Sequence, residues 1–449
     1  MGGGGLMQLV AYGSQDIYLS GKPQITFWKS VYRRHTNFAI ESIPQDVLGT
    51  PQFGAQVSTT ISRAGDLIKR LWIEYSPIDL LEGINNTGPQ TIGANIGHAI
   101  IESATIEIGG QIIDKQYGKW MTIWNYLTEP NPTGEQGAID NDCTGPGEIN
   151  PTDTSGTPFI RGDNAVTEVY PRATKYNRMA YTHRAQVGVT SNNGAAQLAW
   201  VPLQFWFCRN PGLAIPLIAL QYHEVKLFIN IAQLENIRTG SNILGSEFRR
   251  FAIYADFVYL DTTERRQFAQ NAHEYLIEQV QVLESVSAIN IKLPFNHPVK
   301  ELIWTPVPLS VSGTTRSTVV PGGASPNCGF RPSTISVPNT YCLVLNGQNR
   351  FAPRDITYFT RTQVWESHTG FGSVLIPDSI AVYSFAINPE EHQPSGACNF
   401  SRIDMAQLLR SQQFLPGGTT PARDFIDIYA VNYNILRVMN GMGGVAYSN

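Results

Sequence analysis

The sequence predicts an all-β protein built from a duplicated antiparallel domain, with few short helices. Composition, a series of short strand-like runs and an internal repeat predict this class. The 449 residues include 40 glycines and 28 prolines, while 15% are charged and 10% are aromatic. This composition is typical of many strands joined by turns. Because single cores stop growing near roughly 250–300 residues, a chain of this length favours two domains.

Short runs of β-branched and aromatic residues recur between turn residues, and several of them alternate between apolar and polar positions. We expect strands in the runs 67–75, 104–114, 203–208, 225–231, 342–348 and 380–387. Helical periodicity is scarce. Its best candidate is the segment 262–279, where Thr262 or Thr263 would cap the helix.

Four short motifs occur in the same order in both halves of the chain. They pair KRLW with KELIW, IGGQ with LNGQ, FCRNPG with FAINPE, and IYADFVYL with IYAVNYNIL. The outer spacings match, but the middle spacing is 100 residues from Gly110 to Asn210 and only 41 from Gly347 to Asn388. Such a repeat indicates a duplicated domain of roughly 190 residues, which fits an eight-stranded sandwich of the jelly-roll or Greek-key type. The extra residues of the first half include 131–158, a polar segment expected to form a long surface loop.

Charge and cysteine content exclude several classes of protein. The formal net charge is −4 and the isoelectric point is about 6.1, which argues against a nucleic-acid coat with a strongly basic face. The five cysteines form no CxxC pair and are odd in number, so we expect reduced thiols rather than a disulfide framework. No secretory signal opens the chain, and its most apolar short run, 212–222, is too short to span a bilayer. The chain is therefore expected to be soluble.

No motif for catalysis, metal binding or cofactor binding is present. The sequence lacks GxxxxGK[ST], HExxH and GxSxG motifs. The eight histidines are scattered, so no metal cluster is expected from the sequence. Glu390 and Glu391 follow Asn388-Pro389 and are expected in a solvated turn. We therefore expect no catalytic, metal or cofactor residues, although a jelly-roll enzyme such as a glycosidase or cupin stays an open alternative.

Two N-x-[ST] sequons are present. Asn85 lies in GINNTGP, a plausible exposed turn, and is the candidate glycosylation site. Asn399 lies in ACNFSRIDM, where the strand-like context favours burial.

The segment KSVYRRHTNF interleaves basic and aromatic residues. Lys29, Arg33 and Arg34 could form a phosphate-binding strip, lie on a solvated strand face, or pair with carboxylates of a neighbouring chain. Arginine forks suit bidentate pairing with carboxylates at interfaces.

The segment 6–43 resembles the opening of the major capsid proteins of large nucleocytoplasmic DNA viruses, the group containing phycodnaviruses, iridoviruses, marseilleviruses and mimiviruses. It reads LMQLVAYGSQDIYLSGKPQITFWKSVYRRHTNFAIESI. Further blocks agree: SRAGDLI, IEIGGQIIDKQYGKW, NPGLAIPLIALQYHEVKLFINI, YLDTTERRQFAQNAHEYLIEQ, LNGQNRFAPR, QPSGACNFSRID and YNILRVMNGMGGVAYSN. The resemblance runs from end to end and departs mainly in the loops 131–164 and 310–339.

This resemblance implies a double jelly roll, that is, two consecutive eight-stranded antiparallel jelly rolls. It implies an N-terminal arm at 1–25 on the inner capsid face, a first jelly roll with long inserted loops at 26–262, and a second at 263–449. Three chains would form a pseudo-hexagonal capsomer in an icosahedral shell over an internal membrane. The implied partners are neighbouring capsomers and minor capsid and penton proteins, without direct nucleic-acid contact. The implied location is the virion capsid, assembled in the host cytoplasm.

Within that family Lys29, Arg33 and Arg34 would contact neighbouring chains or minor capsid proteins near the inner base of the first jelly roll. The expected function is structural, with no catalysis and no cofactor. The alternative is a viral surface protein that binds glycans, like a lectin or a fibre, because the outer loops of jelly rolls often bind sugars.

Overall fold

The computed structural model describes residues 4–11, 13–24, 27, 32–75, 96–129, 179, 199–233, 248, 250–286, 288–306, 340–370, 372, 380–411 and 426–447. The expected loop 131–158, Lys29 and Asn85 lie outside these residues. The chain divides into two compact units, Met1–Phe38 and Ala39–Asn449. No helix in the described part is long and apolar enough to cross a membrane.

The first unit carries two short helices, α1 (Gly4–Val10) and α2 (Asp16–Ser20). The start of α2 is fixed by Asp16, whose Oδ2 accepts a hydrogen bond of 2.7 Å from the backbone N–H of Gly13. The large apolar side chains described in these helices are exposed, among them Leu9 and Tyr18. The described residues of this unit therefore form no hydrophobic core of their own.

The second unit begins with two antiparallel sheets that share one core. In the first sheet the order is β1 (Phe38–Gln45), β9 (Phe251–Leu260), β3 (Leu67–Tyr75) and β6 (Ala199–Pro202), with β7 (Ile215–Pro216) beside β3. In the second sheet the order is β2 (Gln56–Thr60), β8 (Val225–Ile231), β4 (Ile101–Ile108) and β5 (Gln111–Tyr117). Apolar residues of both sheets, such as Ile73 and Leu227, are fully buried between them.

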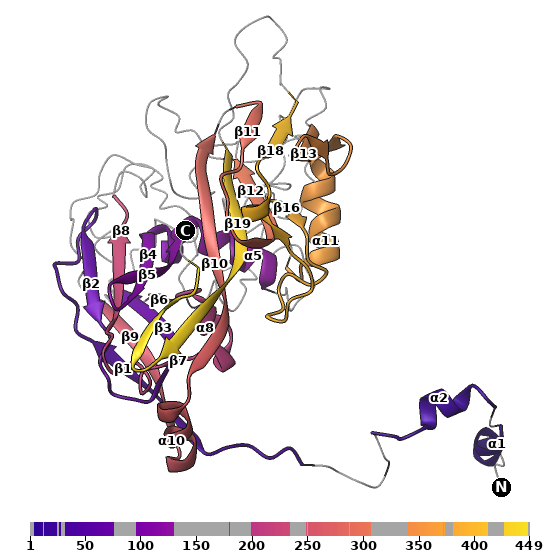
Figure 1. Ribbon diagram of the computed structural model, residues 1–449, viewed down its shortest axis with the longest axis horizontal. Coiled ribbons are helices and arrows are strands. Elements are labelled where there is room, and N and C mark those ends of the chain that lie inside the picture. The colour runs from indigo at the N-terminus through magenta and orange to yellow at the C-terminus, as the bar shows by residue number, and fades with distance from the viewer. Residues whose placement is uncertain are drawn as a thin grey trace, which may run out of the picture. The chain divides into compact units, whose positions relative to one another are not determined.

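The second half repeats this arrangement. One sheet has the order β10 (His273–Val286), β19 (Ile426–Met439), β12 (Pro298–Pro306) and β16 (Ala381–Ser384), with β17 (Cys398–Asn399) and β20 (Met442–Val445) added. The other has the order β11 (Asn290–Lys292), β18 (Ala406–Arg410), β13 (Thr340–Leu345) and β14 (Gln348–Asn349), with β15 (Arg354–Asp355) beside β13. Figure 1 shows β10 and β19 as the long strands between the two halves.

Each half therefore contributes two four-stranded paths with the same connectivity, which is the jelly-roll pattern. The order β1-β9-β3-β6 corresponds to β10-β19-β12-β16, and β2-β8-β4-β5 corresponds to β11-β18-β13-β14. The four repeated motifs fall at matching places: in β3 and β12, in the β4–β5 and β13–β14 turns, after β6 and β16, and in β9 and β19. The predicted double jelly roll is confirmed.

The motifs IGGQ and LNGQ form tight hairpin turns for the same reason. Gly109 and Gly110 have φ angles of 59° and 85°, and Asn346 and Gly347 have φ angles of 48° and 79°. Two consecutive positive φ angles define the type I′ turn, whose twist matches that of the flanking strands and which favours Gly-Gly and Asn-Gly.

The strand register does not place the two motif tryptophans, Trp72 and Trp304, at equivalent positions of the two jelly rolls. Both motif strands contain a bulge, at Lys69 in β3 and at Lys300 in β12. After the bulge, Trp72 lies opposite Tyr254, whereas the residue opposite Tyr429 is Ile303. Trp72 and Trp304 are thus one position apart in the repeat. Because side chains alternate along a strand, Trp304 points into its own core and Trp72 does not.

Two sequence predictions need correction. The predicted helix 262–279 ends early: α10 spans Thr262–Gln270, begins after Asp261, and is followed by β10 from His273. The burial of residues 277–280 on both strand faces outweighs their local helical pattern. The predicted strand 203–208 is also wrong, because it ends in a short helix, α8 (Trp206–Arg209). Its aromatic side chains pack on each other in a helical turn, with Trp206 and Phe207 rings 5.1 Å apart.

Candidate functional site: the junction between the jelly rolls

The sheet β10-β19-β12-β16 is buried on both faces. One face carries Leu302, Trp304 and Ile428 into the core of the second jelly roll. The other face carries Ile303 and Val431 into the core cluster of the first jelly roll. The two jelly rolls therefore share a hydrophobic junction, and separating them would expose a largely apolar sheet face.

A helix of the first jelly roll makes the aromatic part of this junction. Helix α5 (Gly118–Thr128) follows β5 directly. Its Trp120 ring lies 5.5 Å from the ring of Tyr429 in β19, and the Trp120 and Trp124 rings are 5.6 Å apart. The start of α5 also packs closely on its own jelly roll because residue 118 is glycine: a Cβ there would lie 2.1 Å from the carbonyl oxygens of His98 and Ile101.

A buried charge network lies beneath Trp124. The Lys300 side chain is fully buried, and its Nζ lies 2.6 Å from Oε1 of Glu278. The other carboxylate oxygen of Glu278 lies 3.0 Å from the guanidinium of Arg209, which comes from α8 of the first jelly roll. The Arg209 guanidinium also lies 4.8 Å from the centre of the Trp124 ring. Burial alone would raise the pKa of Glu278, but the charges of Arg209 and Lys300 lower it.

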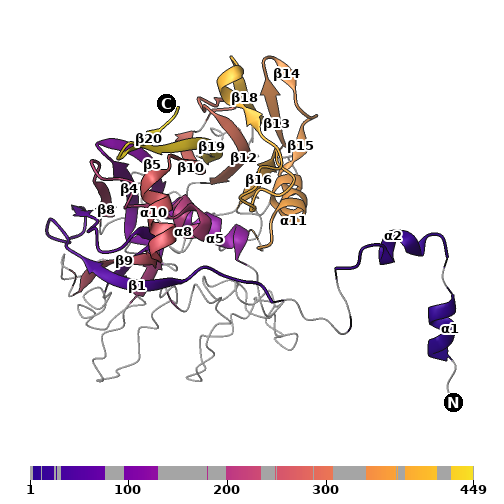
Figure 2. The ribbon, with the colours of Figure 1, turned by 60° about the horizontal axis from the view of Figure 1, so that its bottom comes forward.

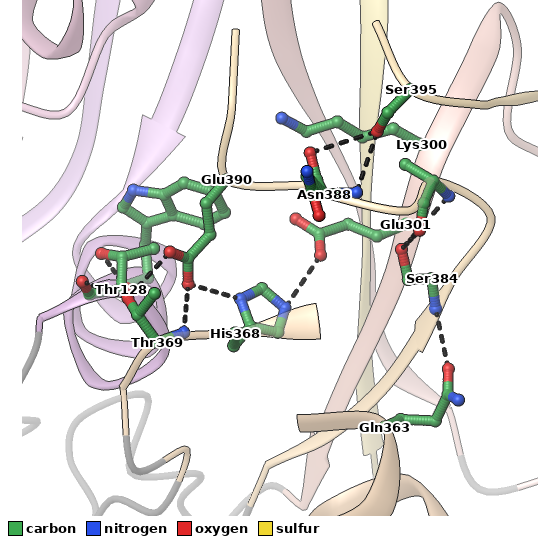
Figure 3. Close-up of polar contacts among 12 residues, drawn as sticks. Thr128, Lys300, Glu301, Gln363, His368, Thr369, Ser384, Asn388, Glu390 and Ser395 are labelled. Carbon is green, nitrogen blue, oxygen red and sulfur yellow. Dashed lines mark hydrogen bonds and ion pairs between the residues drawn. The ribbon is translucent and has the colours of Figure 1, made fainter. Parts of the chain in front are cut away.

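A histidine bridges two carboxylates beside this network (Figure 3). His368 Nε2 lies 3.1 Å from Oε2 of Glu301, and Nδ1 lies 3.0 Å from Oε1 of Glu390. Burial opposes protonation of His368, but the charge of Glu301 and the hydrogen bonds to both glutamates raise its pKa to about 9. His368 is therefore an imidazolium at neutral pH and donates a hydrogen bond through each ring nitrogen.

The residues after His368 bind the end of α5. The backbone N–H of Gly370 donates to the carbonyl oxygen of Leu127 at 2.7 Å. The Thr369 hydroxyl lies 2.8 Å from Oε2 of Glu390 and 3.1 Å from the carbonyl oxygen of Thr128. Since the last carbonyl groups of a helix have no partner within the helix, these bonds satisfy them across the junction.

Strand β5 extends the junction along β10. Asp114 is buried there, and burial raises the pKa of its carboxyl to about 7. Its Oδ2 accepts a hydrogen bond of 3.1 Å from Gln116. Gln279 donates to the carbonyl oxygen of Ile113, and Lys119 forms an ion pair with Asp427. The junction thus combines apolar packing with polar groups that are paired across it.

This arrangement supports a structural role for these residues, which is to hold the two jelly rolls together. Glu278 contacts one cation through each carboxylate oxygen, and His368 contacts one carboxylate through each ring nitrogen, so both side chains are oriented by two charged partners. No group of three or more His, Cys, Asp and Glu side chains in the described ranges could hold a metal ion.

The site residues expected from sequence have different positions. Arg33 and Arg34 are exposed in the extended segment before β1, in the first unit. Glu390 was expected in a solvated turn, but its carboxylate instead binds His368 and Thr369. Asn399 is exposed rather than buried, and its Oδ1 accepts a hydrogen bond of 3.0 Å from the backbone N–H of Ser401.

Sequence reasoning missed the junction itself. Its charged members come from seven separate stretches of the sequence, so no local motif contains them. The usable signal was Lys300-Glu301 within a strand-like motif, because adjacent charges in the middle of an otherwise apolar run require buried partners.

Comparisons with known proteins agree with this architecture. The family model described as "Major capsid protein N-terminus" matches residues 26–261, and that described as "Large eukaryotic DNA virus major capsid protein" matches 264–444. The major capsid protein of Pyramimonas orientalis virus is 42% identical over 467 residues, covering 100% of both chains. That of Paramecium bursaria Chlorella virus 1 is 37% identical over 493 residues, covering 99% of this chain and 100% of the relative.

Solved structures show the same relationship. A quasi-atomic model of the PBCV-1 virus capsid contains a chain with 35% sequence identity and a TM-score of 0.68, which covers 94% of this chain and 100% of its own length. The Faustovirus major capsid protein, at 14% identity and a TM-score of 0.62, shares the fold over 95% of this chain and 94% of its own. These relatives are structural capsid proteins, and they give no support to the glycan-binding alternative. With two jelly rolls of the same connectivity and relatives matched from end to end, the chain belongs to the major capsid proteins of large eukaryotic DNA viruses.

Proposed function

We propose that three copies of this chain close into a capsomer of six jelly rolls, which tiles an icosahedral shell. The observation that carries this proposal is the rigid junction between two jelly rolls of the same connectivity. A chain with two similar domains lets a three-fold object occupy a six-fold lattice position, and symmetric closure buries its side surfaces. Nothing in this role requires catalysis, and we propose that the chain has none.

The remaining parts of the chain receive roles in the same assembly. Residues 1–25 form an arm at the inner capsid face, 26–262 the first jelly roll with its inserted loops, and 263–449 the second. The capsomer meets neighbouring capsomers and minor capsid and penton proteins, close to an internal membrane and without direct contact to nucleic acid. Assembly takes place in the host cytoplasm. The similarity to a chain of the PBCV-1 capsid supports this proposal.

Lys29, Arg33 and Arg34 are proposed to contact neighbouring chains or minor capsid proteins. Arg33 and Arg34 are exposed, so their side chains are available for carboxylates of a partner. We expect the double variant Arg33→Glu and Arg34→Glu to unfold at the same temperature as the wild type but to assemble less well. A variant that fails to fold would instead place these arginines in a structural polar network. Thermal unfolding and sedimentation of the assembled material separate the two results.

Negative-stain electron microscopy of the purified full chain tests the proposed function. We expect particles with a hexagonal outline whose class averages have three-fold symmetry. Particles with the two lobes of a single chain, at concentrations where capsid proteins normally assemble, would contradict the proposal.

A further inference from the structure

The same sheet is covered in one jelly roll and open in the other. In the second jelly roll, the outer face of β10-β19-β12-β16 is buried by the first jelly roll, and Ile303 and Ile380 on this face are fully buried. In the first jelly roll, the corresponding face belongs to β1-β9-β3-β6. The register places Trp72 where Ile303 lies, and Trp200, before Val201, where Ile380 precedes Ala381. Trp72 is only partly buried and Trp200 is 37% exposed.

The open face has the composition of an interface. The Trp72 indole N–H donates a hydrogen bond of 2.8 Å to Oδ2 of Asp256. The Arg70 guanidinium lies 5.1 Å from the centre of the Trp72 ring, and the rings of Trp200 and Tyr254 are 5.4 Å apart. Tryptophan, tyrosine and arginine are the residues enriched at the energetic centres of protein interfaces. At the edge of this sheet, Ile40 in β1 is 46% exposed.

The segments of the first jelly roll that cover the sheet β10-β19-β12-β16 have equivalents in the second jelly roll, and these equivalents are exposed. Helix α5 follows the β4–β5 hairpin; in the second jelly roll, η2 (Tyr358–Thr362) and α11 (Gln363–Ser367) follow the β13–β14 hairpin. Trp124 of α5 is buried in the junction, whereas Trp365 of α11 is 83% exposed. Figures 1 and 2 show α11 on the side of the second jelly roll away from the first. Arg209 in FCRNPG corresponds to Ile387 in FAINPE, which is 76% exposed.

We propose that the outer face of β1-β9-β3-β6 binds the η2–α11 helix of a second copy of this chain, with Trp365 as the anchor. The contact repeats between chains the contact that α5 makes within the chain. It is head-to-tail, because the two surfaces differ, and such an interface closes into a ring when its rotation completes a full turn. Because each chain supplies two of six positions, three chains complete the ring. The inference rests on the proposed capsomer and assigns the surfaces that form it.

The contact between chains differs from the junction in its charge. Ile387 has no guanidinium to pair with a buried carboxylate, so the network of Arg209, Glu278 and Lys300 is not repeated there. The interface between copies therefore depends on aromatic and apolar burial, whereas the junction within the chain is also held by buried ion pairs.

The test substitutes the anchor in the full-length chain. We compare Trp365→Ser with Trp365→Phe, which keeps an aromatic ring, and with Tyr222→Ser as the control. Tyr222 is 76% exposed and lies on neither proposed surface. Because truncation of a buried tryptophan at an interface is among the most costly of substitutions, Trp365→Ser should raise the concentration of half-maximal trimer formation at least about tenfold. Trp365→Phe should recover part of this loss, and Tyr222→Ser should behave as the wild type.

The outcomes distinguish this inference from the proposed function. If the wild type forms no trimer, both fail. If the wild type forms trimers and Trp365→Ser forms them equally well, the capsomer stands and the assignment of this surface is overturned. Should Trp365→Ser not fold, hydrogen exchange of the wild type decides: the amides of α11, β6 and β9 should exchange more slowly in the trimer than in the diluted monomer. Equal rates there would also overturn the inference.

Discussion

Glu278 is the residue on which the junction depends most, because its carboxylate contacts two cations, the buried Lys300 and the partly buried Arg209. Lys300 and Arg209 approach its two oxygens at 2.6 and 3.0 Å. Removal of one partner from a buried ion pair leaves an uncompensated charge and costs about 3–5 kcal/mol. By contrast, exposed ion pairs contribute about 0–1 kcal/mol.

This contrast can be tested on a single strand. Glu278→Gln should lower the free energy of unfolding by about 3–5 kcal/mol, because it leaves Lys300 and Arg209 buried without a counter-charge. Glu274, four residues earlier in β10, forms an ion pair of 2.8 Å with Arg437 at the surface. Glu274→Gln should change the same free energy by less than about 1 kcal/mol. Urea unfolding of both variants gives the answer, and equal effects would mean that the buried network does not stabilise the junction.

His368 makes the junction sensitive to alkaline pH. Its pKa is about 9 in the folded chain, above the ordinary value of 6.5. A raised histidine pKa contributes stability that is fully present below pH 6.5 and is lost as the pH rises through about 9. The difference between the two pKa values corresponds to about 3 kcal/mol.

Unfolding measured between pH 6 and pH 10 tests this contribution. The wild type should lose stability across this range, and His368→Gln, which cannot become charged, should be less stable at pH 6 and show a smaller loss toward pH 10. Parallel pH profiles for the two proteins would show that His368 is not an imidazolium in the folded chain.

At the scale of single elements, the two hairpin turns follow from local sequence. Gly109 and Gly347 both have positive φ angles, but their surroundings differ. A Cβ on Gly347 would meet nothing within 4 Å, whereas a Cβ on Gly109 would lie 2.2 Å from Nδ1 of His223. That histidine nitrogen accepts a hydrogen bond of 3.1 Å from the backbone N–H of Gly443, in the C-terminal hairpin.

Alanine substitutions at the two glycines should therefore separate the cost of backbone strain from the cost of a steric clash. Gly347→Ala should cost about 1–2 kcal/mol, the price of a left-handed backbone for a residue with a Cβ. Gly109→Ala should cost more, since it also displaces His223 from Gly443. Thermal unfolding of the two variants provides the comparison, and a larger loss for Gly347→Ala would contradict it.

The elements that the sequence predicts well are those whose pattern is local. Strands β3 and β8 have the predicted bounds, because their apolar residues alternate and turn residues flank them. The prediction of a strand at 203–208 was wrong because a short aromatic run fits a buried strand and a buried helical turn equally well. The last third of the predicted helix 262–279 is strand because residues 277–279 are buried through contacts with distant parts of the chain that no local window contains.

At the scale of the whole molecule, the internal repeat predicted the architecture, but long-range packing fixed the site. Motif order alone indicated two matching domains. The paired register shows that Lys69 and Lys300 bulge at equivalent positions and that Trp304 lies one residue further from its bulge than Trp72 does, which places the two tryptophans on opposite faces. The junction was hidden because Arg209, Glu278 and His368 meet only after both domains have folded. The same repeat also identifies the open face of β1-β9-β3-β6, because the equivalent face of β10-β19-β12-β16 is covered by the other jelly roll.

The native mass of the purified full chain, measured by light scattering, decides whether three chains form the capsomer. We expect a particle of three times the 49.6 kDa chain mass, because two jelly rolls per chain fill six positions only in a trimer. A particle with the mass of one chain at every concentration would contradict it, since the open face of β1-β9-β3-β6 and the exposed Trp365 would then have no partner copy.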